Sequence, residues 1–182
     1  MNKLRLSYTL CSLWKRGVKE DVLNYYFKLA DLSTYAIEEG KAIDNMVSDC
    51  VIEKKRLPYD LGGDKLKNPK TQLKLEASLN KAFDLVGVLD IYDEPSIIEI
   101  KSGASMDSAD YLNTWQAPIY LLLASLNGLK VDRAWVIHID QSKRKHDRSL
   151  IWNSDSLLER TKEYLYTVGN EIFAFFKQEG LI

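Results

Sequence analysis

Hydrophobic residues follow helical spacing over much of the first fifty residues. The segment after residue 20 carries apolar side chains at i, i+3, i+4 and i+7, the pattern of one helix face: Val22, Tyr25, Tyr26 and Leu29. Either Ser33 or Thr34 can cap a further helix that runs to about Val51. The pattern therefore predicts a helical N-terminal region.

The spacing changes to a period of two after Lys54–Lys70, a polar and basic segment that predicts a long loop. Apolar and polar residues alternate in Thr71–Ala77, as they do in a half-buried strand. Phe83–Tyr92 and Ile97–Lys101 predict two further strands, and Asp93–Ser96 between them has the composition of a turn. Such short connections favour an antiparallel meander.

Helical spacing returns from about Ser108 to Leu126, and Ala134–Ile139 then predicts a fourth strand. A basic loop leads to Leu150–Trp152, a candidate for a short fifth strand. Ser154 or Asp155 caps a long C-terminal amphipathic helix. This order predicts an α+β (mixed α/β) fold, in which helices flank a small mixed sheet that contains the antiparallel meander.

The composition fits one globular domain spanning residues 1–182, with 46% apolar and 28% charged residues. The formal net charge of −1 is unlike that of a DNA-coating protein, so any nucleic-acid contact must come from local patches. Two cysteines cannot form a four-cysteine zinc or iron–sulfur site. The longest apolar run, Ile119–Ala124, is too short to span a bilayer, and no apolar stretch follows the N-terminus. We therefore expect a cytoplasmic protein with no membrane contact.

Three charged residues on the second and third strands of the meander converge on one small surface. If Asp93–Ser96 forms a four-residue hairpin loop, Asp90 lies directly opposite Glu99. Opposed residues of an antiparallel pair have Cβ atoms about 5 Å apart and share a face. Lys101, two residues beyond Glu99, points to the same face.

Two carboxylates this close repel each other unless a positive charge lies between them. A hard divalent cation such as Mg²⁺ suits oxygen ligands, and Lys101 could orient or deprotonate a metal-bound water. These groups are what metal-assisted phosphodiester hydrolysis needs. A plain cross-strand salt-bridge cluster would explain them equally well, although Gly87 inside the strand indicates a bulge or a close backbone approach.

Two further features lie outside the meander. Asp44 falls on the apolar stripe of the helix that ends near Val51, where a carboxylate is costly unless it is paired, metal-bound or at the water-exposed margin. Gln116 and Tyr120 are four residues apart on one helix face, with Pro118 between them. Alone, the second pair is as consistent with core packing as with chemistry.

Taken together, these segments resemble the PD-(D/E)XK nuclease superfamily, particularly its RecB-like and phage-type exonuclease branch. Gly87-Val88-Leu89-Asp90 resembles the G-x-x-D motif, and Glu99-Ile100-Lys101 resembles the (D/E)-x-K motif. Gln116–Tyr120 resembles the Q-x-x-x-Y motif, and Leu6–Leu10 is similar to the Ser/Tyr-containing start of many members. The ordered set spans nearly the whole chain, and it implies a restriction-endonuclease-like core.

By this resemblance, Asp90, Glu99 and the backbone carbonyl of Ile100 would bind Mg²⁺ or Mn²⁺. Lys101 would be the catalytic lysine, and Gln116 and Tyr120 would shape the site and contact substrate. Many RecB-like members place a His four residues after a Gly in the first helical region; here Gly40 is followed at that offset by Asp44, which becomes a further candidate metal ligand. The four cysteines that hold an iron–sulfur cluster in CRISPR-associated relatives are missing from this chain.

Glu76 also matches a position where relatives often carry an acid. It could bind a second ion or bridge to Lys101, and an exposed strand glutamate is an equally good interpretation. Phosphate contacts are expected from basic residues in two segments: Lys65, Lys67, Lys70, Lys143, Arg144, Lys145 and Arg148. Runs of like charge are often plain solvated surface.

The leading hypothesis is a metal-dependent deoxyribonuclease, an exonuclease of phage or recombination and repair type that acts on DNA. One alternative is a non-catalytic nucleic-acid-binding or assembly module that retains the nuclease fold. Another is a structure- or sequence-specific endonuclease. Related phage-type exonucleases may form rings, so a homo-oligomer is a further expectation of the resemblance.

Overall fold

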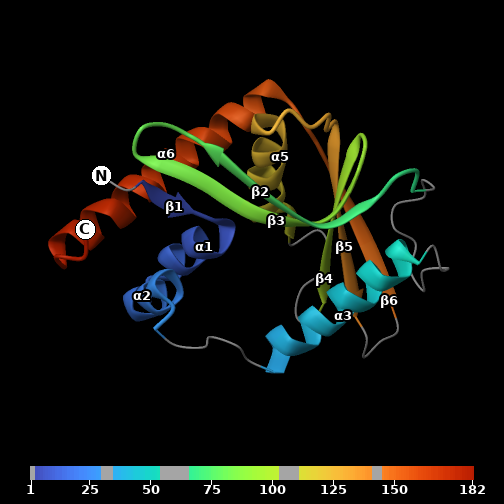
Figure 1. The fold of residues 1–182 in the computed structure, drawn as a ribbon, viewed down its shortest axis with the longest axis horizontal. Coiled ribbons are helices and arrows are strands. Elements are labelled where there is room, and N and C mark those ends of the chain that lie inside the picture. Colours follow the sequence, from blue (N-terminus) through green and yellow to red (C-terminus); the bar gives the residue numbers. More distant parts are fainter. Residues whose placement is uncertain (1–2, 30–34, 54–65, 103–110, 141–144) are drawn as a thin grey trace.

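A mixed six-stranded sheet forms the centre of the fold in the computed structural model, and helices cover both of its faces (Figure 1). The structure describes residues 3–29, 35–53, 66–102, 111–140 and 145–182. Its elements are β1 (Leu4–Leu6), α1 (Tyr8–Arg16), α2 (Lys19–Phe27), α3 (Tyr35–Ile52), β2 (Lys70–Ser78), β3 (Phe83–Asp93), β4 (Ser96–Ser102), α5 (Gln116–Leu126), β5 (Arg133–Asp140), β6 (Lys145–Trp152) and α6 (Asp155–Gln178).

The predicted antiparallel meander is confirmed as β2, β3 and β4. Helix α5 then carries the chain back, so that β5 pairs with β4 in parallel, and β6 pairs antiparallel with β5. The N-terminal strand β1 pairs in parallel with the start of β3. The sheet is therefore mixed, as the order of elements predicted.

The sheet is split along one edge of β3. Strand β2 pairs with β3 from Asp84 to Tyr92 and so occupies the other edge. On the split edge, β1 pairs with residues 83–85 and β4 pairs with residues 91–93. Between them, residues 86–90 of β3 pair with no described strand on this edge. In Figure 1 β1 lies beside one end of β3 and β4 beside the other end, and the open edge lies between them.

The two faces of β4 pack against different helices. Ile97 belongs to a buried cluster with Leu121 of α5, whereas Ile98 and Ile100 pack with Val47 of α3. Each fully buried side chain of this kind contributes roughly 1.5–3 kcal/mol of transfer free energy. This alternation fixes Glu99 and Lys101 on the α5 face, because side chains two residues apart in a strand share a face.

One predicted helix, one predicted strand and the predicted basic loop before that strand differ from the elements observed. The helix expected over Ser108–Leu126 is interrupted at residues 113–115 and begins again at Gln116. Pro118 explains the restart, because a proline is tolerated in the first turn of a helix but not in its interior. The expected fifth strand is longer than Leu150–Trp152, and the basic segment from Lys145 onwards belongs to it rather than to a loop.

Strand β1 lies where the sequence predicted only helix. Three residues are too few for a period to appear, and the pairing of Leu4 and Leu6 with β3 is a tertiary effect. Elsewhere the predicted ends hold: Ser154 caps α6, and α5 ends at Leu126. No helix in the described part of the chain combines the length and apolar character needed to cross a bilayer.

Candidate active site

Asp90 lies at the end of the open edge of β3 and reaches across to β4. The register expected from the turn is observed, since Ile91 pairs with Ile98 and Tyr92 with Ile97. The connecting turn is two residues shorter than expected, because Asp93 also pairs with Ser96. Beyond Ile91 the recorded pairing stops, and the backbone N–H of Ile100 donates instead to Oδ2 of Asp90 at 2.8 Å. The Asp90 carboxylate thus takes the place of a neighbouring strand where the sheet divides.

Glu99 is fully buried beneath α5, with none of its surface exposed to solvent. Nε2 of Gln116 donates to Oε2 of Glu99 at 3.1 Å, and Nζ of Lys101 lies 3.8 Å from the same oxygen. A buried carboxylate is costly without such partners. The start of α5 and the end of β4 together supply the amide and the ammonium group that stabilise its charge.

Tyr120 lies one turn after Gln116 on α5 and packs against β3. Burial, followed by the negative charges of Glu99 and Asp90, raises the pKa of the Tyr120 phenol well above its usual value. A Cβ added at Gly87 would lie 3.0 Å from carbon atoms of Tyr120 and Leu123. The glycine that the sequence marked inside the strand therefore permits a close approach of α5, and Tyr120 remains a protonated hydrogen-bond donor.

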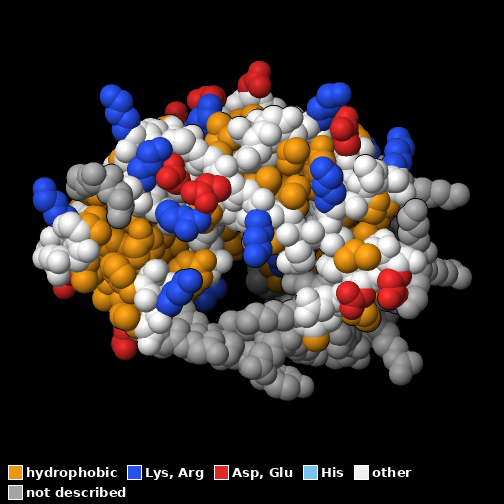
Figure 2. Space-filling view, viewed as in Figure 1, with side chains coloured by type: hydrophobic (Ala, Val, Ile, Leu, Met, Phe, Trp, Pro, Cys, Tyr) orange, Lys and Arg blue, Asp and Glu red, His pale blue; other side chains and the backbone are white. Residues whose placement is uncertain are grey.

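A groove of about 810 Å³ follows the open edge of β3, and we call it the β3 groove. Figure 2 shows a hollow near the centre of this face with Lys and Arg side chains beside it. Asp90 and Tyr120 line the groove together with residues of β1, α1, α2, β2 and β3, which are Arg5, Ser7, Tyr8, Thr9, Tyr25, Lys74, Leu75, Glu76, Val86, Gly87 and Val88. Glu99 and Lys101 do not line the groove but a small separate cavity, together with Tyr111, Thr114 and Gln116.

The donor set at the split fits Mg²⁺ or Mn²⁺, because Asp90, Glu99 and the carbonyl of Ile100 offer hard oxygen atoms. The carbonyl of a strand residue points to the same edge as its N–H, so that of Ile100 faces the gap where Asp90 lies. Within the described ranges, no cluster of three or more His, Cys, Asp or Glu side chains could hold a metal. Asp44 belongs to α3, but its side chain lies outside the described residues.

Asp44 belongs to α3, which packs on the face of β4 opposite Glu99 and Lys101. Its neighbours Ile43 and Val47 are buried in the cluster that contains Ile98 and Ile100. The α3 backbone around Asp44 is thereby held against β4. The predicted third carboxylate ligand remains a prediction.

Glu76 does not bridge to Lys101 as one prediction had it. Its Oε2 accepts from Arg5 at 2.9 Å, and both side chains are more than half exposed. The reason is the alternation along β2: Leu73, Leu75 and Ala77 face the core with α5 and α6, which leaves Glu76 on the opposite, solvent-facing side with Arg5.

Of the residues expected to contact nucleic acid, those whose side chains the structure describes do not line the β3 groove. Lys67 and Lys70 are exposed but do not line it, and Arg148 stacks its guanidinium 5.5 Å from the centre of the Trp135 ring. Lys145 pairs through its backbone with Asp140, and its side chain lies outside the described residues. Lys65, Lys143 and Arg144 also lie outside them. Lys74, at the end of the basic segment that the sequence indicated, lines the groove through the pairing of β2 with β3. Arg5 was missed because only the placement of β1 beside β3 brings it to the groove.

The fold is similar to those of solved exonucleases, although no protein-family model and no curated protein matches the chain. An alkaline exonuclease from Laribacter hongkongensis aligns with 97% of this chain and 93% of its own, at a TM-score of 0.58 and 11% identity. The complex of that exonuclease with dAMP aligns with 96% of this chain and 93% of its own, at a TM-score of 0.54 and 12% identity. A phage-related exonuclease from Haemophilus somnus aligns with 89% of this chain and 83% of its own, at a TM-score of 0.54 and 11% identity. At these identities the likeness establishes the fold, and this chain has the architecture of phage-type exonucleases that its resemblance to PD-(D/E)XK nucleases predicted.

Proposed function

We propose that this protein is a metal-dependent nuclease that hydrolyses phosphodiester bonds of DNA, acting as an exonuclease. The observation that carries the proposal is the convergence of Asp90, Glu99 and Lys101 where the sheet divides. The buried carboxylate of Glu99 and the cross-strand carboxylate of Asp90 flank the backbone of Ile100. A salt-bridge cluster on the surface would not require a buried carboxylate such as Glu99. Nor would it require the hydrogen bond that the Gln116 amide of α5 donates to that carboxylate.

Asp90, Glu99 and the Ile100 carbonyl would hold the metal, with Asp44 as a further candidate ligand. When bound, a divalent cation supplies an acidified water and neutralises charge on the scissile phosphate. The ammonium of Lys101, whose side chain is 19% exposed, would orient that water and stabilise negative charge on a phosphoryl oxygen. Gln116 fixes the orientation of Glu99, and the protonated hydroxyl of Tyr120 would be a hydrogen-bond donor to a substrate in the groove.

The exonuclease assignment is supported by the similar structures, one of which is a complex with dAMP. The β3 groove supports a substrate strand that passes from Asp90 towards the basic side chains of β1 and β2. The rival function is a nucleic-acid-binding module that has lost the chemistry.

The test is cleavage of linear and circular duplex DNA of one sequence, with Mg²⁺ or Mn²⁺. We expect degradation of the linear form only, and a loss of about 10²–10³ in rate for Lys101→Ala, because the ammonium acts on charge that develops during the reaction. Lys130→Ala, at a lysine whose side chain is 82% exposed and outside the groove, is the matched control and should retain its rate. Cutting of the circle would identify an endonuclease, and full activity of Lys101→Ala would falsify the assignment of the site.

A further inference from the structure

A second cavity opens where the β3 groove meets α2, at the end remote from Asp90. It has a volume of about 620 Å³ and is lined by Arg5, Ser7, Asn24, Tyr25, Tyr26, Lys28 and Val86; we call it the α2 pocket. Four of these residues, Arg5, Ser7, Tyr25 and Val86, also line the β3 groove, so the two cavities are continuous. Val86 lies four strand residues before Asp90, or about 13 Å at the usual strand rise.

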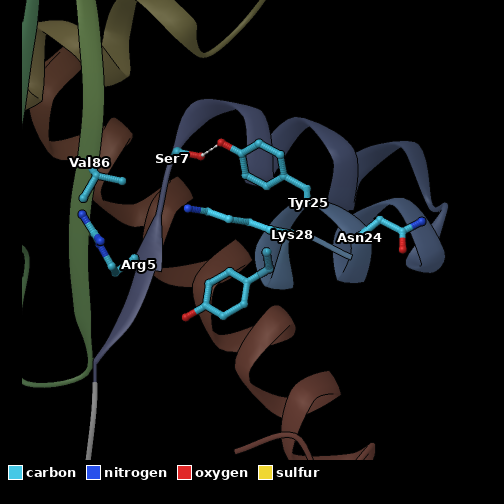
Figure 3. Close-up of a pocket in the computed structure, with 7 residues that line it drawn as sticks. Arg5, Ser7, Asn24, Tyr25, Lys28 and Val86 are labelled. Carbon is cyan, nitrogen blue, oxygen red and sulfur yellow. Dashed lines mark hydrogen bonds between the residues drawn. The ribbon is translucent and has the colours of Figure 1, made fainter. Parts of the chain in front are cut away.

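Lys28 lines this pocket and has an uncommon backbone conformation. It follows the last residue of α2 with φ 54° and ψ 41°, the left-handed region that favours glycine. Figure 3 shows its side chain extending from α2 past Tyr25 towards Val86 and Arg5 on the opposite wall. No ion pair joins Lys28 to a described acid. An anion between Lys28 and Arg5 would relieve the repulsion between the two cations.

Arg5 keeps hydrogen-bonding capacity for such an anion. Its Nη2 donates to Glu76, but the guanidinium carries five N–H donors, and an exposed pair of this kind is held only weakly. Tyr25 supplies the other property of the pocket. Its hydroxyl lies 3.1 Å from Oγ of Ser7, which fixes the ring, and 37% of the residue stays exposed. An exposed, oriented aromatic ring beside two cations is the combination that binds single-stranded nucleic acid.

We infer that the α2 pocket binds one nucleotide of a single strand, its phosphate between Arg5 and Lys28 and its base against Tyr25. The inference rests on the proposed nuclease function, because the pocket continues the groove that leads to Asp90. The size of the pocket decides between a single strand and a duplex, since a cavity of about 620 Å³ holds a nucleotide-sized group but not a double helix. The phosphate is either an internal diester or the terminal monoester of the strand.

The test is binding of fluorescent oligothymidylate, measured by anisotropy at several salt concentrations in EDTA, so that no metal chemistry enters. Lys28→Gln should weaken binding about 5- to 10-fold and lower the slope of log affinity against log salt by about 0.7, the value for one phosphate contact on a single strand. Lys130→Gln, at a lysine 82% exposed outside both cavities, is the matched control and should change neither. An unchanged affinity and slope for Lys28→Gln would overturn the inference.

Three further binding experiments test base stacking, the preference for a single strand and the kind of phosphate that is bound. Tyr25→Leu should weaken binding about fivefold or more, whereas Tyr25→Phe should retain most of it, because stacking needs the ring; equal losses would refute base stacking. A blunt duplex of equal length should be insensitive to Lys28→Gln, and equal sensitivity would contradict the single-strand assignment. Oligonucleotides with and without a terminal phosphate identify which phosphate occupies the pocket. A protein that binds in this way but does not cleave DNA would disprove the proposed function and leave the pocket intact.

Discussion

Two glutamates in this sheet each lie beside a cation, and their surroundings differ. Glu76 of β2 and Arg5 are 2.9 Å apart, and more than half of each side chain is exposed. Glu99 of β4 and Lys101 are 3.8 Å apart, but 1% of the Glu99 side chain is exposed and Gln116 also donates to it. The shorter pair is a surface pair that contributes about 0–1 kcal/mol, whereas removing one partner of a buried pair costs about 3–5 kcal/mol. Burial, rather than distance, distinguishes Glu99, the acid that we propose as a metal ligand.

Neutralising each glutamate in turn is the strongest test of the difference between the buried and the exposed acid. Glu99→Gln should reduce the rate of DNA cleavage by about 10²-fold or more, because the proposed metal site would lose one of its ligands. Glu76→Gln should leave the free energy of unfolding within about 0.5 kcal/mol of the wild type. Parallel cleavage assays and urea unfolding check both. Equal losses of activity would mean that the exposed acid is also part of the metal site.

The contact between α5 and β3 can be tested at Gly87. Gly87→Ala should destabilise the protein by about 1–3 kcal/mol, because the added methyl group crowds Tyr120 and Leu123. Leu123→Ala in the same chain should recover part of this loss, as a double-mutant cycle measured by urea unfolding would reveal. Strictly additive losses would show that Gly87 does not set the approach of α5.

The smallest expected effect concerns the ionisation of Tyr120. Its pKa is raised, mainly by burial and then by Glu99 and Asp90, so the folded protein retains the phenolic proton above pH 10, where the unfolded chain loses it. The associated stability is complete below about pH 10 and is lost as pH rises towards the folded pKa. Tyr120→Phe should leave the ultraviolet tyrosine titration near pH 10 unchanged. The loss of one ionising group there would place Tyr120 in solvent.

The sequence predicted the parts of the site that depend on local pattern. Alternation located the meander strands, and the turn between them fixed the register that brings Asp90 towards Glu99. The spacing of Gln116 and Tyr120 placed both on the face of α5 that meets this register. These features follow from periods of two and 3.6 residues, which a single chain displays.

The remaining features depend on long-range packing. Nothing local in Leu4–Leu6 indicates that it pairs with β3 and leaves an open edge beyond it. Long-range packing also brings Arg5 of β1 and Lys28 of α2 to the same α2 pocket. By contrast, the basic run expected to bind nucleic acid includes Arg148, which stacks on Trp135. Charge runs are visible in a sequence, but isolated cations brought together by the fold are not.

The central claim is that Asp90 and Glu99 form a metal site at the division of the sheet. Calorimetric titration with Mn²⁺ of the wild type and of Asp90→Asn tests it most directly, because the asparagine amide oxygen can still accept the N–H of Ile100. We predict clear binding by the wild type and its loss in the variant, with no change in fold by circular dichroism. No heat at millimolar Mn²⁺, or equal binding by both proteins, would contradict the account.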